Sequence, residues 1–483
     1  MKPVRVTFFV FMAIACLGVI SFFFPADGVK IGSFTIHFPT LTEIFSPESV
    51  EYADITALQQ AADTVVAPTE PVELPDTLEG GFPIRLIEIA DLKTRHLEFP
   101  DGRRSVLYPF FRKLDSLGVA RKQVRILHYG DSQIEGDRIT HLLRRKFQSQ
   151  FGGSGPGIVP VVELYNSRAV NRSLEGNWQR YTLFGQGSKV PHSKYGAMAS
   201  FSRFRPLAQD SLINDSILYS AGVTFTGTGY PFSQCKVFAG NARSPVAVDI
   251  SSNGSLVKSD TIRGNLQIIT AGTGGSDVTI TFSGYDSPDV YGVDLSGGSG
   301  VMVDNLPMRG SSGTVFTRIN ASQLQQMYSA LNVELFILQF GGNVMPYIKN
   351  EQECANYGNW FYSQIMLLKR VRPSASVIVI GPSDMSIKEK EHYLTYPLLE
   401  SVRDALKEAT FKAGGAYWDM YEAMGGKNSM PSWVAADPPL AAADYTHFSP
   451  RGARLIGDMF YNALIWEYQL YRKAPKHQKE KSE

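Results

Sequence analysis

Two polar motifs of this chain lie where predicted buried strands end. Gly130-Asp131-Ser132 comes shortly after an apolar run from Val124 to Leu127, and Gly341-Gly342-Asn343 comes directly after a run from Val333 to Phe340. Short apolar runs bounded by glycine are typical of buried strands. Because ligands bind beyond the carboxyl ends of parallel strands, we expect both motifs at one edge of a sheet in an α/β fold.

A third motif, Asp444-Tyr445-Thr446-His447, lies just before a predicted helix start. Ser449 is a preferred N-cap residue, and Pro450 suits the first helical position. Since only two residues separate Asp444 from His447, both side chains can project from one loop.

After Asn343 the pattern alternates between helical and strand-like segments. Strands that alternate with helices imply a parallel sheet with helices on both faces. The predicted helices lie near Tyr357 to Val371 and Tyr396 to Gly414, and the predicted strands cover Ser376 to Ile380 and Ala416 to Met420.

Between residues 161 and 300 the pattern changes to short runs rich in β-branched residues, separated by clusters of Gly, Ser and Asn. Such spacing is typical of a β-sandwich. Because the segment falls between the first and the later motifs, we predict a domain inserted into a loop of the α/β domain. The insert either binds a ligand or only shields the neighbouring site. Its predicted strands are Val223 to Thr226, Val246 to Ile250, Leu266 to Ile269 and Val278 to Phe282.

Residues 1 to 24 are predicted to form a signal anchor, a membrane-spanning helix. Lys2 and Arg5 precede an apolar stretch from Val6 to Phe24, and a membrane helix needs ~20 such residues. Positive charge on the short side predicts that the rest of the chain lies outside the cytoplasm. A cleaved signal peptide is an alternative, and Ala13-Ile14-Ala15-Cys16 leaves lipidation as another.

Residues 25 to 83 are predicted to be an extended juxtamembrane tether, because they lack sustained periodicity and contain an acidic, proline-rich stretch from Ala67 to Asp76. Helical spacing begins at Ile84, and another helix is predicted near Ser105 to Leu117. The α/β domain is therefore expected to comprise residues 84 to 160 and 301 to 472, followed by a basic tail over 473 to 483.

Composition and spacing exclude several functional classes. Lys and Arg number 47 against 46 Asp and Glu, so no bulk positive charge points to nucleic acid. No Cys/His cluster has metal-ligand spacing and no Walker-type loop is present, so neither a metal nor another cofactor is predicted. The sequence leaves open whether Cys235 and Cys354 pair, and it does not determine the oligomeric state.

Four motifs of this chain resemble, in the same order, the four blocks of the SGNH (GDSL-like) hydrolase superfamily. They are Gly-Asp-Ser, a glycine, Gly-x-Asn and Asp-x-x-His. The second block matches Gly310, which follows an apolar run from Val301 to Val303, and Gly157 is a weaker alternative. The resemblance covers roughly residues 86 to 160 and 300 to 472 and implies a flavodoxin-like parallel-sheet hydrolase domain. With the insert, which resembles a carbohydrate-binding module in size, the arrangement is similar to that of Gram-negative peptidoglycan O-acetylesterases.

The resemblance implies a role for each motif. Ser132 is the expected nucleophile, His447 the base that takes its proton, and Asp444 the group that orients the imidazole. The expected oxyanion donors are the backbone N–H groups of Ser132 and Gly310 and the side-chain amide of Asn343. These residues predict acyl transfer from an ester.

Gln133 departs from the family pattern, because leucine is familiar after Gly-Asp-Ser. A polar residue there is common in the polysaccharide-directed branches of the superfamily, so the resemblance favours sugar esters. Trp418, Trp433 and Tyr445 are either sugar-stacking walls or core residues.

The expected function is that of an extracytoplasmic, membrane-tethered esterase. It would remove O-acyl groups, above all O-acetyl, from a cell-envelope polysaccharide such as peptidoglycan. Two alternatives remain: an O-acetyltransferase that uses the same acyl-enzyme, and a non-catalytic polysaccharide-binding protein.

Overall fold

The computed structural model describes residues 3–25, 28–32, 34–40, 50–65, 96–117, 122–185, 190–207, 217–275 and 277–475. The chain forms two compact units, Met1–Tyr52 and Ala53–Glu483. The first unit contains helix α1 (Pro3–Phe23) and the hairpin of β1 (Val29–Ile31) and β2 (Phe34–Ile36). Among the described helices, α1 alone is long and apolar enough to cross a membrane, with a mean hydropathy of 2.5, and a signal sequence has the same properties.

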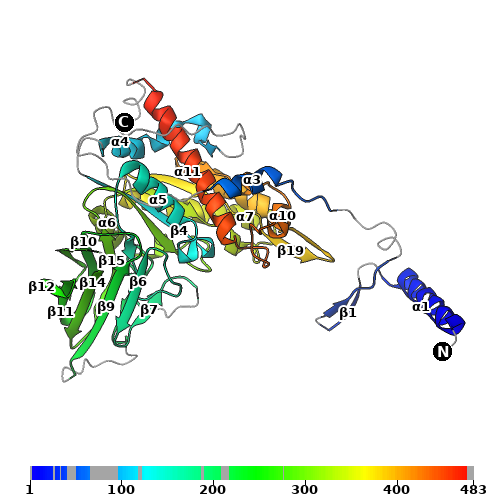
Figure 1. The fold of residues 1–483 in the computed structure, drawn as a ribbon, viewed down its shortest axis with the longest axis horizontal. Coiled ribbons are helices and arrows are strands. Elements are labelled where there is room, and N and C mark those ends of the chain that lie inside the picture. The colour runs from blue at the N-terminus through cyan, green and yellow to red at the C-terminus, as the bar shows by residue number, and fades with distance from the viewer. Residues whose placement is uncertain are drawn as a thin grey trace. The chain divides into compact units, whose positions relative to one another are not determined.

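A six-stranded sheet forms the centre of the second unit, in the order β16-β4-β17-β18-β21-β3 (Figure 1). All neighbours are parallel except the edge strand β3, which is antiparallel to β21. Numbered along the chain, the parallel strands have the flavodoxin-like order 2-1-3-4-5, as expected. The strands are β3 (Leu97–Glu98), β4 (Gln123–Gly130), β16 (Gly300–Pro307), β17 (Val333–Gln339), β18 (Ser376–Ile380) and β21 (Ala416–Trp418).

Helices cover both faces of this sheet, because the strands present apolar side chains on alternate sides. On β17, Leu335 and Ile337 join one buried cluster, and Phe336 and Leu338 join the other. The first cluster includes α4 (Tyr108–Ser116), α5 (Thr140–Phe151) and α11 (Pro450–Lys473), and the second includes α6 (Ala321–Ala330), α7 (Glu351–Val371) and α8 (Leu399–Lys412). Smaller elements near the site are α9 (Met420–Ala423), α10 (Ser429–Ala435) and the hairpin of β19 (Ser386–Glu389) and β20 (His392–Thr395).

The segment between α5 and β16 forms two antiparallel sheets, with strand orders β13-β10-β15-β8-β7 and β12-β11-β14-β9-β6; β5 also pairs with β15. Buried apolar side chains from both sheets form one cluster, for example Val237 on β10 and Ile280 on β14. The four strands predicted for this segment correspond to β9, β11, β13 and β14, although β13 begins at Gln267, one residue after the predicted start at Leu266. The strands are β5 (Gly157–Val159), β6 (Val170–Glu175), β7 (Gln179–Thr182), β8 (Ser200–Arg203), β9 (Tyr219–Gly227), β10 (Gln234–Gly240), β11 (Ala242–Ser252), β12 (Ser255–Gly264), β13 (Gln267–Gly272), β14 (Asp277–Gly284) and β15 (Asp289–Ser296).

A buried ionic cluster joins the insert to the parallel sheet. Arg125 on β4 donates to Asp304 on β16 at 2.8 Å and to Asp294 on β15 at 2.8 Å, and all three side chains are fully buried. Removing one member would leave an uncompensated buried charge, so the cluster fixes β15 against the sheet that carries the motifs.

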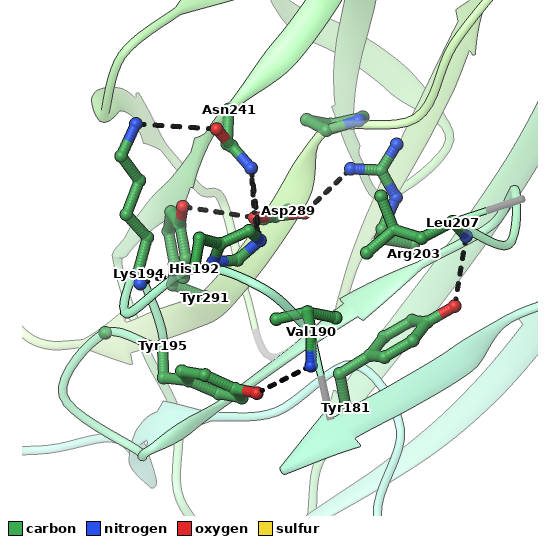
Figure 2. A network of polar contacts seen from close by, with 12 residues as sticks. Tyr181, Val190, His192, Lys194, Tyr195, Arg203, Leu207, Asn241, Asp289 and Tyr291 are labelled. Atoms are coloured by element: carbon green, nitrogen blue, oxygen red, sulfur yellow. Dashed lines mark hydrogen bonds and ion pairs between the residues drawn. The ribbon is translucent and has the colours of Figure 1, made fainter. Parts of the chain in front are cut away.

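A second network organises the insert around Asp289 (Figure 2). Arg203 donates to Asp289 at 2.7 Å and to Asp286 at 2.8 Å, and Asn241 donates to the second oxygen of Asp289 at 2.9 Å. These contacts join β8 to β15, and they join β15 to Asn241, the residue that follows β10.

The structure differs from the extended tether predicted for residues 25 to 83. Residues Thr56–Thr64 form helix α3, in which Leu58 and Ala62 are buried in the core of the second unit. Arg451 on α11 donates to the carbonyl of Gln59 at 3.0 Å. The tether prediction is wrong here because a helix this short is stabilised by tertiary packing and not by a sustained sequence pattern. The Ala67 to Asp76 stretch, the helix predicted from Ile84 and residues 476–483 of the basic tail lie outside the described residues.

Cys235 and Cys354 do not form a disulfide, and both thiols are free and buried. Cys235 lies in the core of the insert, whereas Cys354 on α7 packs in the cluster beneath the parallel sheet. The pairing that the sequence left open therefore fails because the two residues belong to different cores.

Glu467 on α11 gives the fold a specific pH dependence. Its Oε2 accepts from Arg104 at 2.8 Å, while Oε1 is buried without a partner among the described residues. Burial raises the pKa of Glu467 to about 7, although Arg104 acts to lower it. Its contribution to stability is therefore complete below its unfolded pKa near 4.5 and is lost as pH rises through about 7.

Glu467→Gln, which is neutral at every pH, is expected to raise the free energy of unfolding at pH 8 by roughly 1–3 kcal/mol and to change it little at pH 4. Urea titrations at both pH values measure the effect. A loss of stability at pH 8 would show that the ion pair with Arg104 outweighs the cost of burying the charge.

Candidate active site

Ser132 begins a short 3₁₀ helix at the carboxyl end of β4. The helix η4 (Ser132–Asp137) is capped by Asp131, whose Oδ1 accepts from the backbone N–H of Gln133 at 2.9 Å. Arg138 donates to the carbonyl of Ser132 at 2.6 Å. The backbone at Ser132 is thus held from both sides, which fixes the direction of its hydroxyl group.

Parallel strand register brings the first three motifs together. Gly130 at the end of β4 lies opposite Pro307 on β16 and Gln339 on β17. Gly310 and Asn343 follow these two neighbours within a few residues, so both emerge beside Ser132.

The fourth motif reaches the same place from the loop before α11. The Oγ of Ser132 lies 2.8 Å from Nε2 of His447, and Nδ1 of His447 lies 2.7 Å from Oδ2 of Asp444. Ser449 caps α11 by accepting from the N–H of Gly452, and Pro450 occupies the first helical position, as predicted. This chain of contacts has the arrangement of a nucleophile, a base and an orienting carboxylate.

Asp444 is held as an anion beside the imidazole. Burial acts to raise its pKa, but hydrogen bonds from the backbone and side chain of His447 prevail and hold the pKa of Asp444 below its ordinary value. Its Oδ1 accepts from the N–H groups of Thr446 and His447 at 3.0 and 2.9 Å. A carboxylate fixed in this way fits the role of keeping the imidazole oriented and of stabilising its cation.

One pocket contains every predicted oxyanion donor. Gly310 adopts a φ of +72° and lines this pocket, whereas Gly157 lies in β5, where a Cβ atom would meet Oδ1 of Asp304 at 1.9 Å. The backbone N–H groups of Ser132 and Gly310 donate no hydrogen bond to any described residue, so both are available to an anion. The pocket is lined by Asp131, Ser132, Gln133, Gly310, Gln339, Phe340, Gly342, Asn343, Pro346, Tyr347, Gly381, Pro382, Ser383, Met385, Met420, Thr446 and His447.

Asp131 holds the amide of Asn343. The Nδ2 of Asn343 donates to Oδ2 of Asp131 at 3.0 Å and more weakly to the carbonyl of Ser311 at 3.3 Å. Burial raises the pKa of Asp131 to about 6, although hydrogen bonds from Gln133 and Asn343 and the charge of His447 lower it. Only the long contact to Ser311 competes with an incoming oxyanion for the second amide hydrogen.

His128 is a core histidine and not a second base. It is fully buried, with Nδ1 at 2.9 Å from Thr140 and Nε2 at 3.0 Å from Gln339. Burial lowers the pKa of His128 to about 4, so the ring is neutral at neutral pH.

Gln133 joins the nucleophile loop to the histidine loop. Its Nε2 donates to the carbonyl of Thr446 at 2.6 Å, and its Oε1 accepts from the N–H of Phe448 at 3.3 Å. These two partners flank His447 in sequence, and Gln133 itself is 7% exposed. The resemblance associates Gln133 with the class of substrate, and its contacts in addition place it between the loop of Ser132 and the loop of His447.

Gln133→Leu is expected to lower kcat about 10-fold with a smaller change in KM, because it removes two hydrogen bonds that each contribute ~1 kcal/mol and that hold His447 over Ser132. Steady-state kinetics and the rate of fluorophosphonate labelling of Ser132 measure the effect. Gln326→Ala, an exposed glutamine change on α6, is the matched control. An unaltered labelling rate would show that the hydrogen bonds of Gln133 do not control the position of His447.

The aromatic residues fall into two groups. Trp418 and Trp433 are fully buried, so they are core residues and not sugar-stacking walls. Tyr445 stacks on Tyr393 of β20, with ring centroids 3.6 Å apart. Tyr347, which was not predicted from the sequence, is 78% exposed and lines the pocket. Its position four residues after Asn343 was the available signal.

No protein-family model matches the sequence, and no curated protein matches it. The structure is similar to that of a peptidoglycan O-acetylesterase, with 21% sequence identity, a TM-score of 0.59, and coverage of 77% of this chain and 98% of that one. A salicylyl-acyltransferase from a tetracycline biosynthetic pathway (9% identity, TM-score 0.26, coverage of 51% and 82%) and a carbohydrate acetylesterase from Sinorhizobium meliloti (12%, 0.25, 34% and 79%) align too poorly to carry an argument. The first likeness establishes a shared fold over most of the chain.

Proposed function

We propose that the protein is an SGNH-type serine esterase that removes O-acetyl groups from a cell-envelope polysaccharide. The observation that carries the proposal is the contact chain from Ser132 through His447 to Asp444, with spacings of 2.8 and 2.7 Å. Ser132 and His447 line the same pocket as the three proposed oxyanion donors.

The first half of the reaction acylates the enzyme. The Oγ of Ser132 attacks the ester carbonyl as its proton passes to Nε2 of His447, which forms an imidazolium ion beside Asp444. The tetrahedral oxyanion accepts hydrogen bonds from Ser132 N, Gly310 N and Asn343 Nδ2. As the bond from the carbonyl carbon to the sugar oxygen breaks, His447 protonates that oxygen, so the sugar leaves with a free hydroxyl group and an acyl-serine remains.

The second half releases the acid. Water gives a proton to His447 and attacks the acyl-serine, and collapse of the new tetrahedral intermediate returns the proton to Oγ of Ser132 and frees acetate. Phe340, Met385 and Met420 line the pocket with apolar surface, which suits a small acyl group such as acetyl.

Three features support a polysaccharide outside the cytoplasm as the substrate. The fold is shared with a peptidoglycan O-acetylesterase, residues of the insert line a pocket together with Arg309, which precedes Gly310, and α1 has the length and hydropathy of a membrane anchor. We propose that α1 tethers the enzyme and that the insert binds the glycan.

The test incubates the full-length protein in detergent with O-acetylated peptidoglycan and follows free acetate. Wild-type enzyme is expected to release acetate, and added sugar acceptors are expected to leave the yield unchanged. Transfer of acetyl to the acceptor at the expense of free acetate would identify an O-acetyltransferase. Absence of both products, together with no hydrolysis of an aryl acetate, would contradict catalysis and favour a binding protein.

A further inference from the structure

A second pocket lies next to the oxyanion loop, between the parallel-sheet domain and the insert. The end of β16 and Arg309 form one side, and Arg309 directly precedes Gly310. The insert contributes Glu163, Tyr165, Arg180 and Phe184. A glycan whose acyl group sits at Ser132 can therefore extend into a pocket with walls from both domains.

The pocket lining carries two arginines and two glutamates, and Arg180 is the member of this group without a close partner among the described residues. Arg309 lies 3.6 Å from Glu135, and Arg172, behind the pocket wall, pairs with Glu163. Arg180 makes neither a hydrogen bond nor an ion pair shorter than 4 Å with any described residue, and its Nε is buried. The Nε and Nη2 atoms of Arg172 are also buried and unpaired within the described part of the chain. The carboxylates of Glu163 and Glu135 act on Arg180 only from beyond ion-pair distance, so buried N–H donors of Arg180 and Arg172 are left without acceptors among the described residues.

The strand that carries Arg180 is held in place by its surroundings. The neighbour of Arg180 on β7, Tyr181, accepts a hydrogen bond from the N–H of Leu207 at 3.2 Å and stacks on Phe201 with ring centroids 5.1 Å apart. Figure 2 shows Tyr181 beside the Arg203 and Asp289 network, which fixes β8 to β15. Because the strand is fixed, a ligand that binds Arg180 needs to order only the side chain and not the backbone.

The chemistry of the walls indicates the kind of ligand. A guanidinium group presents N–H donors in a planar fork that matches a carboxylate. Tyr165 and Phe184 add ring surface beside Arg309 and Arg180, at 5.2 and 5.9 Å from the guanidinium carbons to the ring centroids. Apolar ring faces and a few placed polar groups are typical of a sugar site.

We propose that this pocket is a subsite for a carboxylate group carried by the glycan substrate and that Arg180 is the residue that binds it. The proposal rests on the proposed function for the identity of the glycan, but the binding that it predicts does not require catalysis. The carboxylate is either a substituent of the sugar itself or the end of a peptide attached to the sugar.

The test measures binding to full-length Ser132→Ala protein in detergent, which cannot turn the ligand over. The ligands are an O-acetylated disaccharide with a free carboxylate, the same compound with that group capped as a methylamide, and the same compound with the group linked to a short peptide that ends in a carboxylate. The free carboxylate is expected to bind about 10- to 100-fold more tightly than the capped form. Recovery of affinity with the peptide ligand identifies the peptide carboxylate as an acceptable source, and capped-like affinity restricts the site to the sugar carboxylate.

Arg180→Gln in the same background is expected to reduce the affinity for the free carboxylate to that of the capped ligand, whereas Arg180→Lys retains part of the preference. The capped ligand serves as a control for folding, because a damaged protein would lose both affinities. Arg263→Gln, an exposed change on β12 of the insert, is the charge-matched control and is expected to leave all affinities unchanged.

Equal affinity for free and capped ligands, a preference that survives Arg180→Gln, or no binding of any ligand would overturn the subsite. Acetate release by the wild-type protein reports separately on the proposed function. An Arg180-dependent preference in a protein that releases no acetate would leave the subsite standing and contradict the esterase.

Discussion

Ser132→Ala is expected to abolish acetate release and covalent labelling by a fluorophosphonate. The hydroxyl group at 2.8 Å from Nε2 of His447 is the attacking group in our mechanism, and removal of a nucleophilic serine from a comparable triad lowers kcat by ~10⁶. The residual rate would come from the oxyanion donors and from substrate binding. Mass spectrometry of the labelled protein and an acetate assay measure both effects.

Ser401→Ala is the matched control, because Ser401 lies on α8 and hydrogen bonds Glu351, outside the pocket. It is expected to keep full labelling at Ser132. Labelling of another serine in the wild-type protein, or a Ser132→Ala variant with full activity, would refute the assignment of the nucleophile.

Asn343→Ala is expected to lower kcat by ~10²–10³ with little change in KM, because its amide would bind charge that develops only in the transition state. The contact with Asp131 at 3.0 Å orients the amide, and the second hydrogen has only the 3.3 Å contact to Ser311 before the oxyanion forms. Steady-state kinetics with an aryl acetate measure the effect free of glycan binding.

Asp131→Asn tests how the amide of Asn343 is oriented. The substitution offers either a donor or a poorer acceptor to Asn343 and Gln133, so kcat is expected to fall. The double variant with Asn343→Ala is expected to lose less than the product of the single losses, since both changes act through one contact. Asn359→Ala, exposed on α7, is the control.

An unchanged kcat in Asn343→Ala would show that Asn343 is only a turn residue and not an oxyanion donor.

Local sequence patterns determined the architecture and the identity of the motif residues. Apolar runs of strand length followed by glycine placed Ser132 and Asn343 at strand ends. The runs are recognisable because a strand of a parallel sheet is buried on both faces and therefore consists of consecutive apolar residues. The Asp444 to His447 loop was equally predictable, since its two residues are three apart and the N-cap and proline that follow are local signals.

Tertiary structure alone decided the features that depend on residues far apart in the chain. The hydrogen bond from Gln133 to Thr446 spans 313 positions, and no periodicity encodes such a partner. Helix α3 in the predicted tether exists because α11 and the core beneath it cover its apolar side.

The chemical type of a residue likewise does not determine whether its side chain is buried. Trp418 and Trp433 have the composition of a sugar-binding wall but lie fully inside the core, whereas Arg180 lines a pocket and its Nε has no acceptor among the described residues. A residue's type fixes which interactions it can make, and whether water, protein or ligand supplies the partner is settled by packing between distant segments. The sequence therefore determined the candidate reactive groups and their order, and the assembled fold decided which of them meet.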